Sequence, residues 1–139
     1  MSGSPDRAAI DQLRGAAEEA MHRAYAPYSS FRVGAALLGD DGSVTQGCNV
    51  ENASYSATIC AERSAIASAV SRGVRKFSAL VLVTEAEHPT PPCGVCRQVL
   101  VEFSPALPVV SITKAGAEER WSLADLLPHP FNPDSLSRT

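Results

Sequence analysis

Hydrophobic residues near the start of the chain recur at intervals of three and four positions, which is the spacing of one buried helix face. A Ser4-Pro5-Asp6 segment precedes this pattern and Pro27 follows it, and such residues mark the two ends of a helix. The pattern therefore predicts a first helix. Its buried face would carry Ile10, Leu13, Ala17, Ala20 and Ala24.

Short apolar runs further along the chain predict strands. Residues 31–39 (FRVGAALLG) and 43–50 (SVTQGCNV) are β-prone, and the Asp40-Asp41-Gly42 step between them favours a tight turn, so they are expected to form a hairpin. The continuous run FSALVLVT at 77–84 is typical of a central strand covered on both faces. Two further strands are predicted at 107–113 (LPVVSIT) and, more weakly, at 118–123 (EERWSL).

Two more helices are predicted between the strands. Alanines with Ile66 suit a buried helix from Cys60 to about Val70, with Thr58 as its N-terminal cap and Gly73 marking its end. Residues 94–103 form the third predicted helix. Loops are expected at 49–55 and 85–92, and a proline-spaced tail at 126–136.

The order of these elements, α-β-β-α-β-α-β-β, predicts an α/β fold in which helices pack against a mixed sheet of five strands. A length of 139 residues and a hydrophobic content of 45% suit a single domain spanning residues 1–139. Residues 1–5 and 137–139 are expected to be disordered.

Charge and hydropathy limit the classes of partner that this protein is expected to bind. The chain has 12 basic and 15 acidic side chains, a net charge of −3 and no stripe of Lys or Arg, so we expect no nucleic-acid partner. No run approaches the roughly 18 apolar residues of a membrane span, and MSGSPDRAAI is unlike a signal peptide. We therefore expect no membrane partner and a cytoplasmic protein whose thiols stay reduced.

Three of the four cysteines fall at predicted helix starts. Cys60 begins the second helix, and Cys93 and Cys96, in PPCGVCRQ, begin the third. Unpaired backbone N–H groups and the helix dipole stabilise thiolate there, and thiolate is the form that binds metal. A Cys-x-x-Cys pair with a glycine in its turn can chelate one ion, which needs a further ligand from elsewhere.

Four other interpretations of the cysteines compete with a metal site. Two disulfides fit the count, but a chain that looks cytosolic and has a sizeable core does not need them. A thioredoxin-like redox pair suits CGVC but leaves Cys60 and Glu62 unexplained. A structural four-cysteine zinc site would need Cys48, which is not spaced from Cys60 as a chelating pair. The cysteines can also be small core residues, which is our interpretation of Cys48.

A three-thiolate zinc site would explain the neighbouring glutamate as a catalytic residue. Three protein ligands leave one tetrahedral position for water, as in catalytic zinc sites. Glu62, two positions after Cys60, can then move protons between that water and a substrate. Zinc nucleobase deaminases share this pattern, a ligand followed by x-Glu and then Pro-Cys-x-x-Cys. Here the pieces are Cys60-Ala61-Glu62 and Pro92-Cys93-Gly94-Val95-Cys96.

The chain closely resembles the small homotetrameric cytidine deaminases. The resemblance rests on NVENASYSATICAER with PCGVCRQVL, and also on PYSSFRVGAALL at 27–38 and LLPHPFNPDSL at 126–136, so it covers nearly the whole chain. It implies a three-layer α/β/α fold, one Zn²⁺ per subunit and sites shared within a homotetramer. It also implies hydrolytic deamination of cytidine and 2′-deoxycytidine in pyrimidine salvage.

The resemblance further implies a role for each matched residue. Cys60, Cys93 and Cys96 would be the zinc ligands and Glu62 the general acid/base. Arg63 would donate hydrogen bonds to the thiolates and offset their charge. The substrate contacts implied are Asn49 and Glu51 at the ribose, Phe31 beside the pyrimidine, the Ala61 backbone at its edge, and Tyr55 and Phe131 reaching a neighbouring subunit's site.

Two positions depart from the family pattern. Asn132 stands where a glycine commonly follows the stacking phenylalanine, and asparagine tolerates the left-handed backbone conformation that such a turn requires. Ser56 also stands where glycine or proline is often found.

Other functions remain open from the sequence. A blasticidin-type antibiotic deaminase would share the Cys-x-Glu and PCxxCRQ chemistry, although NVENASY and Phe131 favour a nucleoside. A zinc-stabilised binding module would unfold without metal and turn over no substrate. A polynucleotide deaminase is disfavoured by the acidic balance.

Overall fold

The computed structural model describes residues 5–136. Residues 1–4 and 137–139, where disorder was expected, lie outside the described part, whereas Pro5 is described and precedes the first helix. Within residues 5–136, no helix has both the length and the apolar character that crossing a membrane requires.

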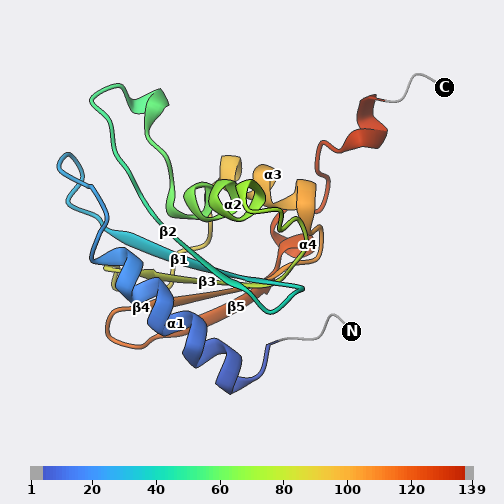
Figure 1. Ribbon diagram of the computed structural model, residues 1–139. Helices are drawn as coiled ribbons and strands as arrows, with labels where there is room; N and C mark the ends of the chain where they lie inside the picture. The colour runs from blue at the N-terminus through green and yellow to red at the C-terminus, as the bar shows by residue number, and fades with distance from the viewer. Residues whose placement is uncertain (1–4, 137–139) are drawn as a thin grey trace.

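The centre of the fold is the predicted sheet of five strands, in the order β2-β1-β3-β4-β5 (Figure 1). β1 pairs antiparallel with both β2 and β3, β3 pairs parallel with β4, and β4 pairs antiparallel with β5. The mixed sheet is therefore confirmed. The strands are β1 Val33–Gly39, β2 Val44–Cys48, β3 Phe77–Thr84, β4 Pro108–Thr113 and β5 Glu118–Ser122.

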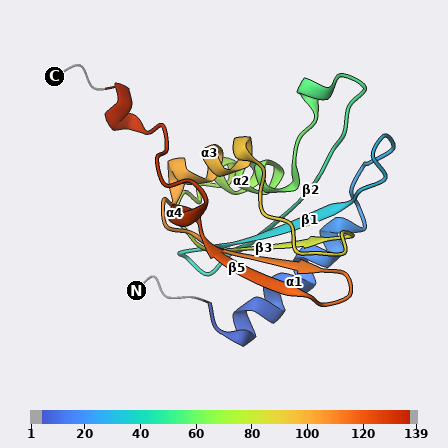
Figure 2. The same ribbon diagram turned by 180° about the vertical axis from the view of Figure 1, so that it is seen from behind.

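Helices cover both faces of the sheet, which makes the three layers that were expected. α1 (Arg7–Met21) packs on one face, against Ala36, Val81 and Ile112 among others. α2 (Ala61–Ser71) and α3 (Gly94–Phe103) pack on the other face (Figures 1 and 2). Residues alternate between the two cores along β1 and β3, as the period of a strand dictates.

The direction of the strands brings the two helix starts together. β2 and β3 both run antiparallel to β1, so they run parallel to each other and end beside the start of β1, where Gly34 pairs with Cys48 and Val33 with Thr84. α2 follows β2 and α3 follows β3 in the chain. Both helices therefore begin at the same edge of the sheet.

Close packing between β2 and α2 also fixes the position of the first turn of α2 at this edge of the sheet. A Cβ atom on Gly47 would lie 2.4 Å from the Ala65 nitrogen and 2.5 Å from the Ala61 carbonyl oxygen. Only glycine permits this approach without a shift of the backbone. The first turn of α2 is thus held directly against the end of β2.

Two predicted helix boundaries were wrong. The first helix ends at Met21, and Ala24 follows it in a turn that leads to backbone pairing between Tyr25 and Val50. Cys60, not Thr58, is the N-cap residue of α2, because Thr58 ends a short 3₁₀ turn and its hydroxyl accepts a hydrogen bond from the Asn52 nitrogen at 3.1 Å.

The connecting segments contain more structure than the sequence predicts. A 3₁₀ turn, Tyr55–Ala57, lies before α2, and toward the end of the chain are α4 (Leu123–Leu126) and a second 3₁₀ turn, Pro133–Leu136. Asn132 does not adopt a left-handed conformation. Its side chain instead accepts a hydrogen bond from the Ser135 nitrogen at 3.3 Å, which closes the last turn.

Candidate active site

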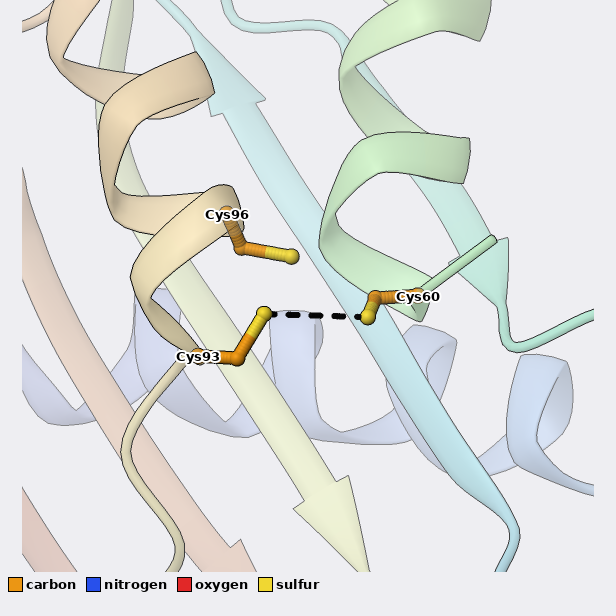
Figure 3. Close-up of side chains that lie close together, drawn as sticks. All are labelled: Cys60, Cys93 and Cys96. Atoms are coloured by element: carbon orange, nitrogen blue, oxygen red, sulfur yellow. Dashed lines mark hydrogen bonds between the residues drawn. The ribbon is translucent and has the colours of Figure 1, made fainter. Parts of the chain in front are cut away.

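The three predicted metal ligands meet between the starts of α2 and α3. The Sγ atoms of Cys60, Cys93 and Cys96 all lie within 4.8 Å of one another, and those of Cys60 and Cys93 are 3.8 Å apart (Figure 3). Cys60 and Cys93 are the N-cap residues of the two helices, but neither sulfur caps its helix, so both are available to a ligand. Cys96 lies in the first turn of α3 and is fully buried.

This donor set fits zinc. Sulfurs each about 2.3 Å from a common tetrahedral ion are separated by about 3.8 Å, which is the spacing of Cys60 and Cys93. All four cysteines are free thiols, so the disulfide interpretation is wrong. Cys48 is outside the cluster and only half-buried at the end of β2, not a core residue as predicted, and its partial burial raises the pKa of its thiol.

The thiols of Cys60 and Cys96 do not ionise equally. Hydrogen bonding from Cys96, with smaller help from Arg63 and Cys93, lowers the pKa of Cys60 to about 5. Cys96 shows the opposite shift, because it shares a proton with the Cys60 thiolate and is buried, so the pKa of its thiol is raised. Cys60 therefore ionises before Cys96, and a metal ion must displace the proton of Cys96 as it binds.

Glu62 is a buried carboxyl group beside the cluster. It is the second residue of α2 and only 6% exposed. Burial raises its pKa to about 7, and the charge of Cys60 adds to the effect. A carboxyl group that titrates near neutrality can both accept and deliver a proton, which is what a general acid/base requires.

Arg63 lies beside the Cys60 sulfur. Its Nη2 atom donates a hydrogen bond to the Thr58 carbonyl oxygen at 3.1 Å and lies 3.8 Å from the Cys60 sulfur. The Cys60 thiolate raises the pKa of this guanidinium. Its buried Nε atom has no hydrogen-bond partner within residues 5–136. A positive charge held here offsets the negative charge of the sulfurs.

Two of the predicted sugar contacts lie at the entrance to β1. The Asn49 amide accepts a hydrogen bond from the Val33 nitrogen at 2.9 Å and donates one to the Phe31 carbonyl oxygen at 2.8 Å. The Glu51 carboxylate accepts hydrogen bonds from the nitrogens of Tyr28 and Ser29, at 3.0 and 3.1 Å, and from the Ser29 hydroxyl. Both side chains therefore fasten the segment before β1, and their contact with a sugar stays a prediction.

A small cavity opens beside Glu51. Its volume is about 220 Å³, and its lining is formed by Tyr28, Ser29, Glu51, Asn52, Tyr55 and Thr58. Phe31 is half-buried two residues before β1 and does not belong to either core, so simple core packing does not account for it. Ala61 is the first residue of α2 and is fully buried, so its contact with a substrate stays a prediction.

Tyr55 and Phe131 are not buried within the chain. Tyr55 is 83% exposed on the turn that projects beyond β2, and Phe131 is 59% exposed on the tail that leaves the body after α4 (Figures 1 and 2). The Phe131 carbonyl oxygen accepts a hydrogen bond from Gln98 at 2.7 Å. Both aromatic rings are thus presented to whatever lies outside this chain.

Sequence reasoning missed several residues that hold the site together. Arg97, directly after the Cys-x-x-Cys pair, donates to the Pro92 carbonyl oxygen at 2.8 Å and to the Leu126 carbonyl oxygen at 2.9 Å. Gln98 and Ser29 were also given no role. Their position next to recognised motifs was the only indication in the sequence, because hydrogen bonds between distant segments follow no local pattern.

Three converging thiols beside a buried glutamate define the class of zinc-dependent hydrolytic deaminases. Comparison with known proteins agrees. A family model described as the cytidine and deoxycytidylate deaminase zinc-binding region matches residues 9–113.

Individual relatives match over most of their length. The cytidine deaminase of Sporosarcina psychrophila is 47% identical over 129 residues, which are 92% of this chain and 95% of that protein. The cytidine deaminase of Halalkalibacterium halodurans is 45% identical over 120 residues, or 86% and 91% of the two chains. A crystal structure of cytidine deaminase from Burkholderia pseudomallei has a TM-score of 0.83 at 47% identity, covering 91% of this chain and 100% of that one.

The chain therefore belongs to the cytidine and deoxycytidylate deaminase family. It is a hydrolytic deaminase, and its three-cysteine cluster holds one zinc ion per subunit.

Proposed function

We propose that this protein hydrolyses cytidine and 2′-deoxycytidine to uridine and 2′-deoxyuridine, with release of ammonia, as a step of pyrimidine salvage. The observation that supports this most strongly is the buried carboxyl group of Glu62 beside three converging thiols. The names of relatives at 45% and 47% identity supply the substrate class.

Zinc held by Cys60, Cys93 and Cys96 would act as a Lewis acid that activates water. Glu62 carries out the proton transfers. Its carboxylate accepts a proton from the attacking water and delivers it to N3 of the pyrimidine, and a second proton passes through it to the leaving amino nitrogen. Water supplies the oxygen that becomes the C4 carbonyl of the product, and the C4–N4 bond breaks to give ammonia.

The remaining residues orient the nucleoside. Phe31 would pack beside the pyrimidine, and backbone groups near Ala61 would hold its polar edge. Asn49 and Glu51 would bind the sugar hydroxyls through the donor and acceptor positions that their bonds within the chain leave available. Arg63 would keep the thiolates from accumulating excess negative charge. Each of these roles is supported by position at the shared edge of the sheet.

We propose a homotetramer whose sites are shared between subunits. Large apolar side chains are exposed on backbone segments that pair with one another, namely Tyr25 at 56%, Val50 at 43% and Ile59 at 42%. Such a surface is typical of a subunit interface. The outward-facing rings of Tyr55 and Phe131 would then cover a neighbour's substrate. Ligand thiols require a reducing compartment, which supports a cytoplasmic location.

The deciding experiment follows the loss of ultraviolet absorbance of cytidine on mixing with zinc-loaded protein. Wild type should turn over, and Glu62→Gln should retain one zinc per subunit while losing about 10²–10⁴-fold in kcat. Glu102→Gln is the matched control, because it makes the same change at an exposed position of α3. Substantial turnover by Glu62→Gln would remove the proton-transfer role. A folded, zinc-loaded wild type that leaves cytidine unchanged would overturn the proposed substrate.

Subunit sharing has its own test. Subunits carrying Glu62→Gln are mixed, after dissociation, with subunits carrying Phe131→Ala. If Phe131 serves a neighbouring site, some sites in the mixed oligomer regain both groups and activity returns above that of either variant alone. A fully active monomer in sedimentation analysis would contradict the shared sites.

A further inference from the structure

Ser29 lies beside Glu51, and neither the motifs nor the reaction assigns it a task. It lies in the segment before β1, opposite Glu51, and lines the cavity of about 220 Å³. Its hydroxyl donates to Oε2 of Glu51, and its backbone nitrogen donates to Oε1 of the same carboxylate at 3.1 Å. One residue thus contacts both oxygens of Glu51.

The direction of the Ser29 hydroxyl is determined by a second contact. Its Oγ atom accepts a hydrogen bond from the Phe31 nitrogen at 3.0 Å. A hydroxyl has a single proton to donate, and with the Phe31 N–H occupying a lone pair that proton is directed to Glu51. The hydroxyl therefore connects the residue expected at the sugar with the residue expected at the pyrimidine.

The acceptor capacity of Glu51 is nearly used up by these contacts. A carboxylate has about four acceptor sites, two on each oxygen. Oε1 accepts from the nitrogens of Tyr28 and Ser29, and Oε2 accepts from the Ser29 hydroxyl. About one site remains, and it belongs to the oxygen that the Ser29 hydroxyl holds.

The backbone beside Ser29 is also held in an unusual conformation. Ser30 has a φ of 58°, in the left-handed region, and its nitrogen donates to the Ala26 carbonyl oxygen at 3.0 Å. Serine rarely adopts this conformation, which persists only where surrounding contacts impose it. The contacts of Ser29 with Glu51 and Phe31 are such contacts.

We propose that Ser29 is a positioning residue for sugar recognition, whose hydroxyl orients the Glu51 carboxylate so that the remaining acceptor site of Oε2 takes a hydroxyl group of the nucleoside. This inference rests on the proposed function, because it assumes that Glu51 binds the sugar. Ser29 itself acts through Glu51 and need not touch the reacting atoms.

A double-mutant cycle on cytidine turnover tests the proposal. Ser29→Ala should raise KM about tenfold, the order expected for losing a hydrogen bond to a charged group, and change kcat less than about twofold. In a Glu51→Gln background the same substitution should raise KM less than about twofold, because the group it orients is already altered. Zinc content and thermal unfolding of each variant are measured alongside.

Two further variants separate positioning from a general effect on the loop. Ser29→Thr retains the hydroxyl and should restore most of the wild-type KM. Ser30→Ala removes a neighbouring exposed hydroxyl that has no hydrogen-bond partner within the described residues, and should resemble wild type. If Glu51→Gln proves too unstable to assay, Ser29→Ala is compared with wild type on 2′,3′-dideoxycytidine, where equal KM values are expected.

The outcomes distinguish this inference from the proposed function. Wild-type turnover with an unchanged KM in Ser29→Ala would overturn the inference alone. An equal rise in KM in both backgrounds would also overturn it, since Ser29 would then act through the backbone of Phe31 and not through Glu51. Absence of cytidine turnover by the zinc-loaded wild type would overturn the proposed function, and this inference with it.

Discussion

The cysteine cluster and the wall, by which we mean residues 28–32 before β1 and 49–51 after β2, lie at the same edge of the sheet but are built in different ways. The three thiols come from the starts of two helices whose strands are parallel, so regular secondary structure places them. The wall consists of two loops joined by hydrogen bonds from side chains such as Asn49 and Glu51 to backbone groups. The cysteine cluster thus lies on regular secondary structure, whereas the residues proposed to bind the substrate lie on connecting segments.

This difference has consequences for mutation. Removing a group from the cluster should abolish a function outright, because no neighbouring group can replace a metal ligand. The wall is held by several hydrogen bonds, so the loss of one should change binding or stability only moderately. Four substitutions test this contrast, in order of decreasing expected effect.

The largest effect is expected for Cys96→Ser. It removes a fully buried ligand, and the purified protein should contain almost no zinc and show no measurable deamination. Metal content by atomic emission and turnover of cytidine provide the measurements. Cys48→Ser is the matched control, because Cys48 lies outside the cluster, and it should retain one zinc per subunit. Full zinc content in Cys96→Ser would show that the cluster is not the metal site.

Arg63→Ala should weaken zinc binding without abolishing it. Its guanidinium lies 3.8 Å from the Cys60 sulfur, and loss of such a supporting contact typically lowers metal affinity or activity about 10–100-fold. Competition with a chelator gives the affinity. Arg75→Ala, at an exposed position, should leave it unchanged. An unaltered zinc affinity in Arg63→Ala would contradict the proposal that Arg63 offsets the charge of the thiolates.

Gly47→Ala tests how far the cluster depends on packing against the sheet. The added methyl group would lie 2.4 Å from the Ala65 nitrogen, and the displacement of α2 should lower the free energy of unfolding by about 1–3 kcal/mol. Gly15→Ala is the control, and it is expected to change the free energy of unfolding in the opposite direction. Nothing lies within 4 Å of its added methyl group, and alanine in helix α1 should stabilise by about 0.5–1 kcal/mol. Equal denaturation curves for the two variants would refute the close approach.

The smallest effect is expected at the Arg32–Glu85 ion pair, which fixes the end of the wall. The Arg32 backbone and guanidinium both donate to Glu85, and hydrogen bonding from Arg32 lowers the pKa of Glu85 to about 2. A lowered pKa means that the stabilisation is complete above the ordinary value near 4.5 and is lost as the pH falls toward 2.

Glu85→Gln should therefore lower the thermal unfolding midpoint slightly at pH 7 and leave it unchanged near pH 2. Melting curves across this pH range, with the exposed Glu87→Gln as control, measure the difference. A difference between Glu85→Gln and wild type that did not depend on pH would mean that Glu85 acts through packing, not charge. A large loss of stability at pH 7 would show that the wall tolerates substitution no better than the cysteine cluster does.

Much of the architecture could be read from local patterns. Apolar spacing located all five strands and the three main helices, since each pattern reflects which face of an element is buried. Boundaries that depend on distant partners were missed. Ala24 lies outside α1 because the chain turns to pair Tyr25 with Val50, and α4 begins at Leu123, the last residue of the predicted fifth strand.

The sequence by itself determined the chemical inventory of the site. It supplied three thiols at helix starts and a glutamate two positions after the first of them, because these features depend on residues close together in the chain. Only the tertiary structure decided that Cys60 meets Cys93 and Cys96, since that requires β2 and β3 to run in the same direction. It also decided that Glu62 is buried, which raises its pKa to about 7, and that Ser29 reaches Glu51. Burial and contacts between distant segments depend on how the whole chain packs, and no local pattern encodes them.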